Sequence, residues 1–102
     1  MVNPPSEGVP EDLSDFEILV QASLGEVGSP GEEVFYFTVC TASQLARVSA
    51  GSFLTCTLVV DRFEWDTVTS RVEKLLRHTE SCANWADAIA TLSRFIRHEA
   101  AA

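Results

Sequence analysis

Every second residue from Phe16 to Leu24 is apolar, and this repeat of two is typical of a half-buried β-strand. Three glycines and a proline interrupt the pattern between residues 25 and 31. The next segment, Glu33 to Cys40, is again rich in aromatic and β-branched residues. The two segments therefore predict a β-hairpin with a longer than minimal loop.

The returning segment of this hairpin is apolar on both of its faces. Its two faces carry Phe35, Phe37 and Val39 on one side and Val34, Tyr36 and Cys40 on the other. A strand of this kind is usually central and covered at least partly on both sides. Thr41 follows it and is placed to cap a short helix over Ala42 to Val48.

The second half of the chain predicts one further strand and two helices. Phe53 to Asp61 alternates and is expected to be a strand, with Leu54, Cys56, Leu58 and Val60 on its apolar face and a mixed opposite face. Asp66 is expected to cap one helix and Asn84 the next. The apolar stripes of these helices are Val68, Val72, Leu75 and Leu76, then Trp85, Ala88, Ile89, Leu92, Phe95 and Ile96.

This order of elements predicts an α+β fold, in which an antiparallel sheet of about three or four strands has the two C-terminal helices packed on one face. Residues 1–15 carry three prolines and are expected to be a flexible polar lead-in, and residues 16–102 a single domain. We find no secretory signal pattern and no run of about 20 apolar residues, so a cytoplasmic protein is expected. In that compartment Cys40, Cys56 and Cys82 are expected to be reduced thiols.

The net charge of −8 is concentrated in the first third of the chain. Residues 1–33 hold eight of the fifteen acidic residues and no lysine or arginine, so the remaining seven acids cancel the seven bases that follow. Such a surface repels nucleic acids and anionic membranes and attracts cationic partners. Solubility alone is the alternative explanation of the same charge.

The usual signatures of catalysis and cofactor binding are missing from the sequence. It has no GxSxG, P-loop or GxGxxG pattern, and His78 and Cys82 alone do not make a zinc site. His78 and His98 are instead expected near helix C-termini. Glu32 and Glu33 are adjacent on a strand and point to opposite faces, which disfavours a pair of catalytic carboxylates. We therefore expect neither an enzyme nor a cofactor or metal site.

Trp65 lies among acidic residues in the connection between the third strand and the first long helix. Asp61, Glu64 and Asp66 surround it in the sequence. An aromatic side chain ringed by carboxylates suits a protein interface, whereas helix capping and surface charge are the simpler explanation of the acids. Core packing is expected instead for Trp85, Phe35, Phe37, Leu92 and Phe95.

The segment Gly31 to Leu45, which reads GEEVFYFTVCTASQL, resembles the immunity protein 8 family that accompanies bacterial polymorphic toxins. The resemblance extends upstream to residues 16–25. Downstream it includes Asn84-Trp85, Leu92, Arg94-Phe95 and Glu99. The chain departs from the family at its end, where Glu99 is followed by three alanines instead of an aromatic-acidic segment.

The resemblance implies a small α+β protein without catalytic activity, which binds and neutralises the toxin domain encoded beside it. The expected partner is therefore a toxin protein rather than a nucleic acid or a membrane. We expect contact through Glu26, Glu32 and Glu33 at the hairpin loop, with Tyr36 and Trp65 as aromatic anchors. A homo-oligomer is compatible with the sequence but not indicated by it. The alternative is a small acidic secretion chaperone, usually an obligate dimer, that holds an effector unfolded.

Overall fold

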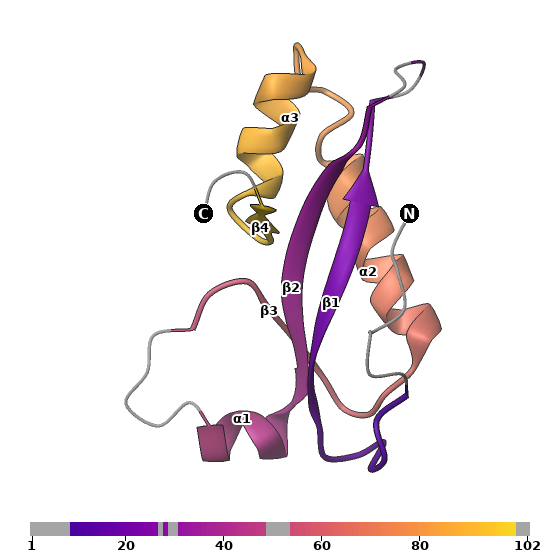
Figure 1. Ribbon diagram of the computed structural model, residues 1–102, viewed down its shortest axis with the longest axis vertical. Coiled ribbons are helices and arrows are strands. Elements are labelled where there is room, and N and C mark those ends of the chain that lie inside the picture. The colour runs from indigo at the N-terminus through magenta and orange to yellow at the C-terminus, as the bar shows by residue number, and fades with distance from the viewer. Residues whose placement is uncertain (1–8, 27, 29–30, 49–53, 100–102) are drawn as a thin grey trace.

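The computed structural model describes residues 9–26, 28, 31–48 and 54–99 of the chain, and it has the predicted α+β architecture (Figure 1). Four strands form one sheet, and three helices accompany it. In chain order the elements are β1 (Glu17–Leu24), β2 (Glu33–Thr41), α1 (Ala42–Val48), β3 (Thr57–Val60), α2 (Trp65–Arg77), α3 (Trp85–Leu92) and β4 (Arg97–His98).

The predicted hairpin is present, with β1 and β2 paired antiparallel along their whole length. The register runs from Glu17 opposite Cys40 to Leu24 opposite Glu33. At the base of the loop the two arms approach closely, because a Cβ atom placed on Gly25 would lie only 2.6 Å from the carbonyl oxygen of Gly31. Glycine is therefore required where the chain leaves β1.

β2 is the central strand, as its two apolar faces predicted. β1 lies along one of its edges, and β3 and β4 share the other. β4 runs antiparallel, with Arg97 opposite Tyr36, whereas β3 runs parallel to β2, with Thr57 opposite Thr38. A parallel neighbour needs a crossover of a dozen or more residues, and residues 42–56, which include α1, supply it. The sheet is thus mostly antiparallel rather than wholly so.

The third strand is shorter than predicted, because β3 begins only at Thr57. Cys56 has a φ of 51°, in the left-handed region that a β-strand excludes, so the extended backbone cannot start before it. Phe53, the predicted first residue of this strand, lies outside the described residues.

The hydrophobic core lies between one face of the sheet and the helices α2 and α3, which cover the same face as predicted (Figure 1). The sheet contributes alternate residues of its long strands, including the fully buried Val20, Phe35 and Val39. Val68 and Val72 of α2 complete the core, together with Leu92 of α3 and the buried Ile96 that follows it. This arrangement leaves the other face of the sheet, which carries Leu19 and Tyr36, without a helix layer from α2 or α3.

Helix caps agree with the sequence at two of three positions. The Thr41 hydroxyl accepts a hydrogen bond from the Gln44 N–H at the start of α1, and the Asn84 side chain accepts from the Asp87 N–H at the start of α3. The predicted Asp66 cap is wrong, because α2 begins two residues earlier than this cap requires and Glu64 holds the N-cap position in extended backbone, without a side-chain capping bond. Asp66 lies inside the first turn, where a carboxylate favours the helix dipole.

The last helix ends earlier than its apolar stripe suggested, and this corrects the prediction for Phe95. α3 stops at Leu92, and residues 93–95 form a turn. Ile96 reaches the core, while the side chain of Phe95 is directed outward, so that this residue is 54% exposed. Phe95 is therefore not a core residue.

The stretch before β1 is attached to the domain where the structure describes it, and residues 1–8 lie outside the described residues. The Phe63 N–H donates to the carbonyl oxygen of Leu13 over 2.7 Å. Arg47 of α1 donates to Asp15 over 2.6 Å, and the Ser43 hydroxyl donates to the same carboxylate over 2.9 Å. The hydrogen bond from Arg47 is the main cause of a lowered pKa of Asp15, and the hydrogen bond from Ser43 acts in the same direction.

Candidate functional site

The five predicted contact residues lie at three separate places along the hairpin. Glu26, Glu32 and Glu33 are at its loop end, and Tyr36 is near the middle of β2. Trp65 is at the opposite end, where β1 begins. Because β1 has eight residues, the two ends are about 25 Å apart. The structure thus brings the three glutamates together and places Trp65 away from them.

Trp65 is half-buried and belongs to an aromatic cluster inside the protein. Its ring stacks on Phe63 with centroids 6.5 Å apart, and Phe63 meets Phe16 edge-on at 5.6 Å. The tryptophan also packs against the hydrophobic core. Most of its ring surface is therefore engaged in internal packing at the start of α2.

Glu33 differs from its neighbours at the loop, because its carboxylate is engaged within the protein. Its Oε2 atom lies 2.9 Å from Nε2 of His98, whose side chain is only 12% exposed. The prediction that His98 sits near a helix C-terminus is wrong, since it belongs to β4. Glu26 and Glu32 are exposed, and neither has a hydrogen-bond or ion-pair partner among the described residues.

Tyr36 lies on the face of the sheet opposite the core. Its hydroxyl donates a hydrogen bond to Oε1 of Glu99 over 3.1 Å. This carboxylate raises the pKa of the phenol, and loss of surrounding water acts in the same direction. Beside it, Arg97 of β4 and the exposed Leu19 of β1 help to line a hollow of about 240 Å³. The open face therefore offers a mixed polar and apolar surface around one tyrosine.

A second hollow, of about 460 Å³, lies where the hairpin loop meets the connection between α2 and α3. Glu26 from the hairpin and Glu80 from the connection both line it, with the half-buried Trp85 between their elements. Glu32 is adjacent, since its Cγ would lie 3.4 Å from a Cβ placed on Gly25. We call Glu26, Glu32, Glu80 and Trp85 the hairpin-end surface.

The hairpin-end surface contains two residues, Trp85 and Glu80, that were not among the predicted contact residues. Trp85 fits the apolar stripe of α3, and Glu80 follows α2 as one acid among many. No local pattern links either of them to Glu26. Their proximity arises only because the hairpin loop lies beside the α2–α3 connection. Trp85 is thus an aromatic residue that lines the same hollow as the loop carboxylate of Glu26.

The acidic residues that the structure describes in the first third of the chain lie in two separate groups. Glu26, Glu32 and Glu33 are at the loop, whereas Glu11, Asp12, Asp15 and Glu17 precede or begin β1 at the far end. Asp15 in the second group is neutralised by Arg47. The hairpin-end surface therefore carries three exposed carboxylates, from Glu26, Glu32 and Glu80, that are suited to a cationic partner.

Within the described ranges no three histidine, cysteine or acidic side chains converge as a metal site, and no helix has the length and apolarity to cross a bilayer. His78 is the C-cap of α2, near a helix C-terminus as expected, and Cys82 lies beyond the helix. All three cysteines are free thiols, and burial raises the pKa of Cys40.

Comparison with known proteins identifies one family. The family model described as Immunity protein 8 matches residues 3–101, which is nearly the whole chain. No curated protein and no solved structure gives a significant match.

Proposed function

The chain belongs to the immunity protein 8 family, and from this membership we propose that it protects a bacterial cell by binding and occluding the toxin domain encoded beside it. The observation that carries the proposal is the family match, because it covers residues 3–101 and therefore the complete sheet and all three helices. Neutralisation requires only a stable complex, and we propose that the protein acts in the cytoplasm without catalysing a reaction.

We propose that the hairpin-end surface is the main contact with the toxin. Exposed carboxylates around the half-buried Trp85 combine the two features that protein interfaces favour, an aromatic anchor and a charged rim. Glu33 supports this surface by fixing the start of β2 to β4, and Tyr36 extends it along the open face of the sheet. Trp65 contributes to binding indirectly, because its packing stabilises the opposite end of the hairpin.

The negative charge of this surface supports the proposal that the toxin has a cationic substrate groove. Many toxin domains are nucleases, and an acidic inhibitor occupies such a groove as a mimic of phosphate groups. Opposite charges on the two partners speed their encounter and disfavour wrong partners. An interface of standard size buries about 1,600 Å² and uses roughly 20–30 residues on each side. Such an interface would use about a quarter of this chain of 102 residues.

Co-expression with the adjacent toxin domain tests the function directly. We expect rescue of growth and co-purification of a complex in which the toxin is folded. Failure of both would contradict the proposal, and a dimer of this chain that holds an unfolded toxin would indicate a secretion chaperone instead.

A matched pair of double variants tests the surface. The first variant combines Glu26→Gln with Glu32→Gln, and the second combines Glu11→Gln with Glu17→Gln. Each removes two negative charges, the first at the hairpin loop and the second at the opposite end of the hairpin. We expect the first pair to slow association about tenfold at low salt and the second to have little effect, because steering depends on charge near the interface. Equal effects of the two pairs, or association that is insensitive to salt, would contradict an acidic hairpin-end contact.

A further inference from the structure

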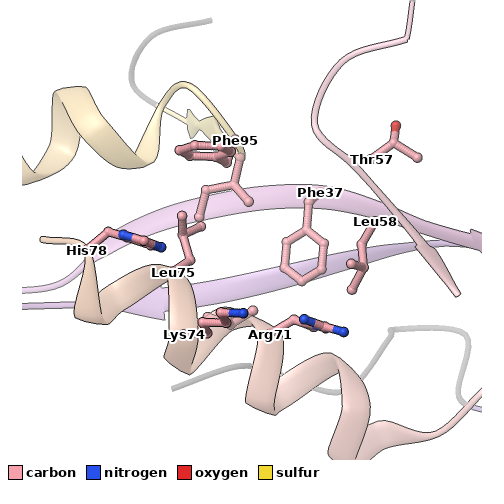
Figure 2. A pocket seen from close by; sticks show the side chains of 10 residues that line it. Phe37, Thr57, Leu58, Arg71, Lys74, Leu75, His78 and Phe95 are labelled. Carbon is pink, nitrogen blue, oxygen red and sulfur yellow. The ribbon is translucent and has the colours of Figure 1, made fainter.

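An apolar groove of about 390 Å³ lies between α2 and the edge of the sheet formed by β3 and the β4 region. Figure 2 shows Phe37 directed from β2 toward α2 at the floor of this groove. Leu58 of β3 lies on one side of it, and Leu75 of α2 and Phe95 lie on the other (Figure 2). Among the described residues, the groove shares only Phe37 with the hollow beside Tyr36.

The apolar lining of the groove is only partly covered by this chain. Leu58 and Leu75 are half-buried, and Phe95 is 54% exposed. The turn after α3 causes the exposure of Phe95, because it buries Ile96 and leaves the ring of Phe95 at the edge of the groove. An exposed aromatic ring beside partly covered leucines is a typical centre of a protein interface.

The rim of the groove has the opposite charge to the molecule as a whole. Arg71, Lys74 and His78 project from α2 along it, and all three are exposed. No aspartate or glutamate is among the described residues that line the groove. Within the described part of the chain, Arg71 and Lys74 have no ion-pair partner. A protein of net charge −8 therefore presents unpaired cations at an apolar groove.

We propose that this groove receives a large apolar side chain from an acidic segment of the toxin. The carboxylates of such a segment would face Arg71 and Lys74, and its apolar side chain would enter between Leu75 and Phe95. This inference rests on the proposed function and adds to it a second contact of opposite charge. Together with the acidic hairpin-end surface, the basic groove fixes a single orientation of the partner, because a reversed complex places like charges together.

The dye 8-anilinonaphthalene-1-sulfonate serves as the first probe, since it combines an aromatic body with an anionic group. We expect its fluorescence to rise with the folded protein and to fall several-fold in the variants Lys74→Glu and Phe95→Ala. Arg94→Glu is the matched control, because Arg94 is exposed and undergoes the same charge reversal outside the groove. Near-ultraviolet circular dichroism verifies that each variant is folded. Equal fluorescence in all four proteins would overturn the groove assignment.

The adjacent toxin domain is the second probe, and it separates the two proposals. We expect the toxin to displace the dye and to bind Lys74→Glu and Phe95→Ala at least tenfold more weakly than Arg94→Glu. If the toxin binds every variant equally and leaves the dye in place, the groove inference fails while neutralisation stands. If wild-type protein neither binds nor protects, the proposed function itself fails. Displacement of the dye by increasing concentrations of this chain alone would identify a second copy as the occupant and overturn the assignment.

Discussion

Nε2 of His98 lies 2.9 Å from Oε2 of Glu33 and joins the C-terminal strand to the first residue of β2. β4 has only two residues, so backbone pairing alone gives it little support. The His98 ring also packs on Phe35, with centroids 4.9 Å apart. These two side-chain contacts hold the short strand β4 against β2.

The first prediction concerns the contribution of this contact to stability. Replacing Glu33 by alanine is expected to lower the free energy of unfolding by about 1 kcal/mol, because the largely buried His98 loses its hydrogen-bond partner. Chemical denaturation measures the change. Glu32→Ala is the matched control and should stay within about 0.5 kcal/mol of wild type, since Glu32 is exposed and has no partner among the described residues. Equal stabilities of the two variants would show that the contact contributes nothing.

The second prediction follows from the hydrogen bond between Tyr36 and Glu99. Tyr36 is the single tyrosine of the chain, so ultraviolet absorbance reports its titration without interference. We expect its pKa to lie above the ordinary 10.0 in the folded protein and to move toward 10.0 in Glu99→Ala. Glu17→Ala removes an exposed carboxylate from the same face of the sheet and should leave the titration unchanged.

The sign of the linked stability follows from this raised pKa. The folded state favours the protonated phenol, so the contribution is fully present below pH 10.0 and disappears as the pH rises through the folded pKa. Wild type and Glu99→Ala should therefore become more alike in stability at alkaline pH. A difference that grows above pH 10 would contradict the assignment of the hydroxyl as donor.

The third prediction concerns Thr41, which is the last residue of β2 and directly precedes α1. Its buried hydroxyl accepts from the N–H of Phe16 over 3.2 Å, and its own N–H donates to the carbonyl oxygen of Phe16 over 3.1 Å. Thr41→Val keeps the shape but leaves the Phe16 N–H without a partner, which is expected to cost about 1–3 kcal/mol. Thr41→Ser retains the acceptor and should cost less. If thermal or chemical unfolding shows that Thr41→Ser is less stable than Thr41→Val, this role of the hydroxyl is contradicted.

Local sequence signals predicted the part of the fold that depends on neighbouring residues. The alternation of β1, the two apolar faces of β2 and the caps Thr41 and Asn84 each reflect a pattern within a few residues, and each is present in the structure. The loop glutamates could be grouped for the same reason. Trp65 could not be separated from them, because its position about 25 Å away depends on the length of β1.

The remaining differences arise from tertiary structure or from backbone geometry. Cys56 adopts a left-handed φ that no residue type in its neighbourhood signals, and this delays the start of β3. β4 follows directly after the apolar stripe of the last helix and was not predicted, since two residues are too few to show a period of two. Glu80 and Trp85 join Glu26 only through the packing of the hairpin against the α2–α3 connection.

The last prediction tests where the final helix ends. Phe35 is fully buried, so Phe35→Ala is expected to lower the free energy of unfolding by about 3–5 kcal/mol through lost burial and the cavity left behind. Phe95 is 54% exposed, and Phe95→Ala should cost less than about 1 kcal/mol. A continuous helical stripe through Phe95 requires similar losses at the two positions. Comparable destabilisation would therefore restore the sequence prediction, whereas a wide difference supports an early end at Leu92 and a phenylalanine that is free to contact a partner.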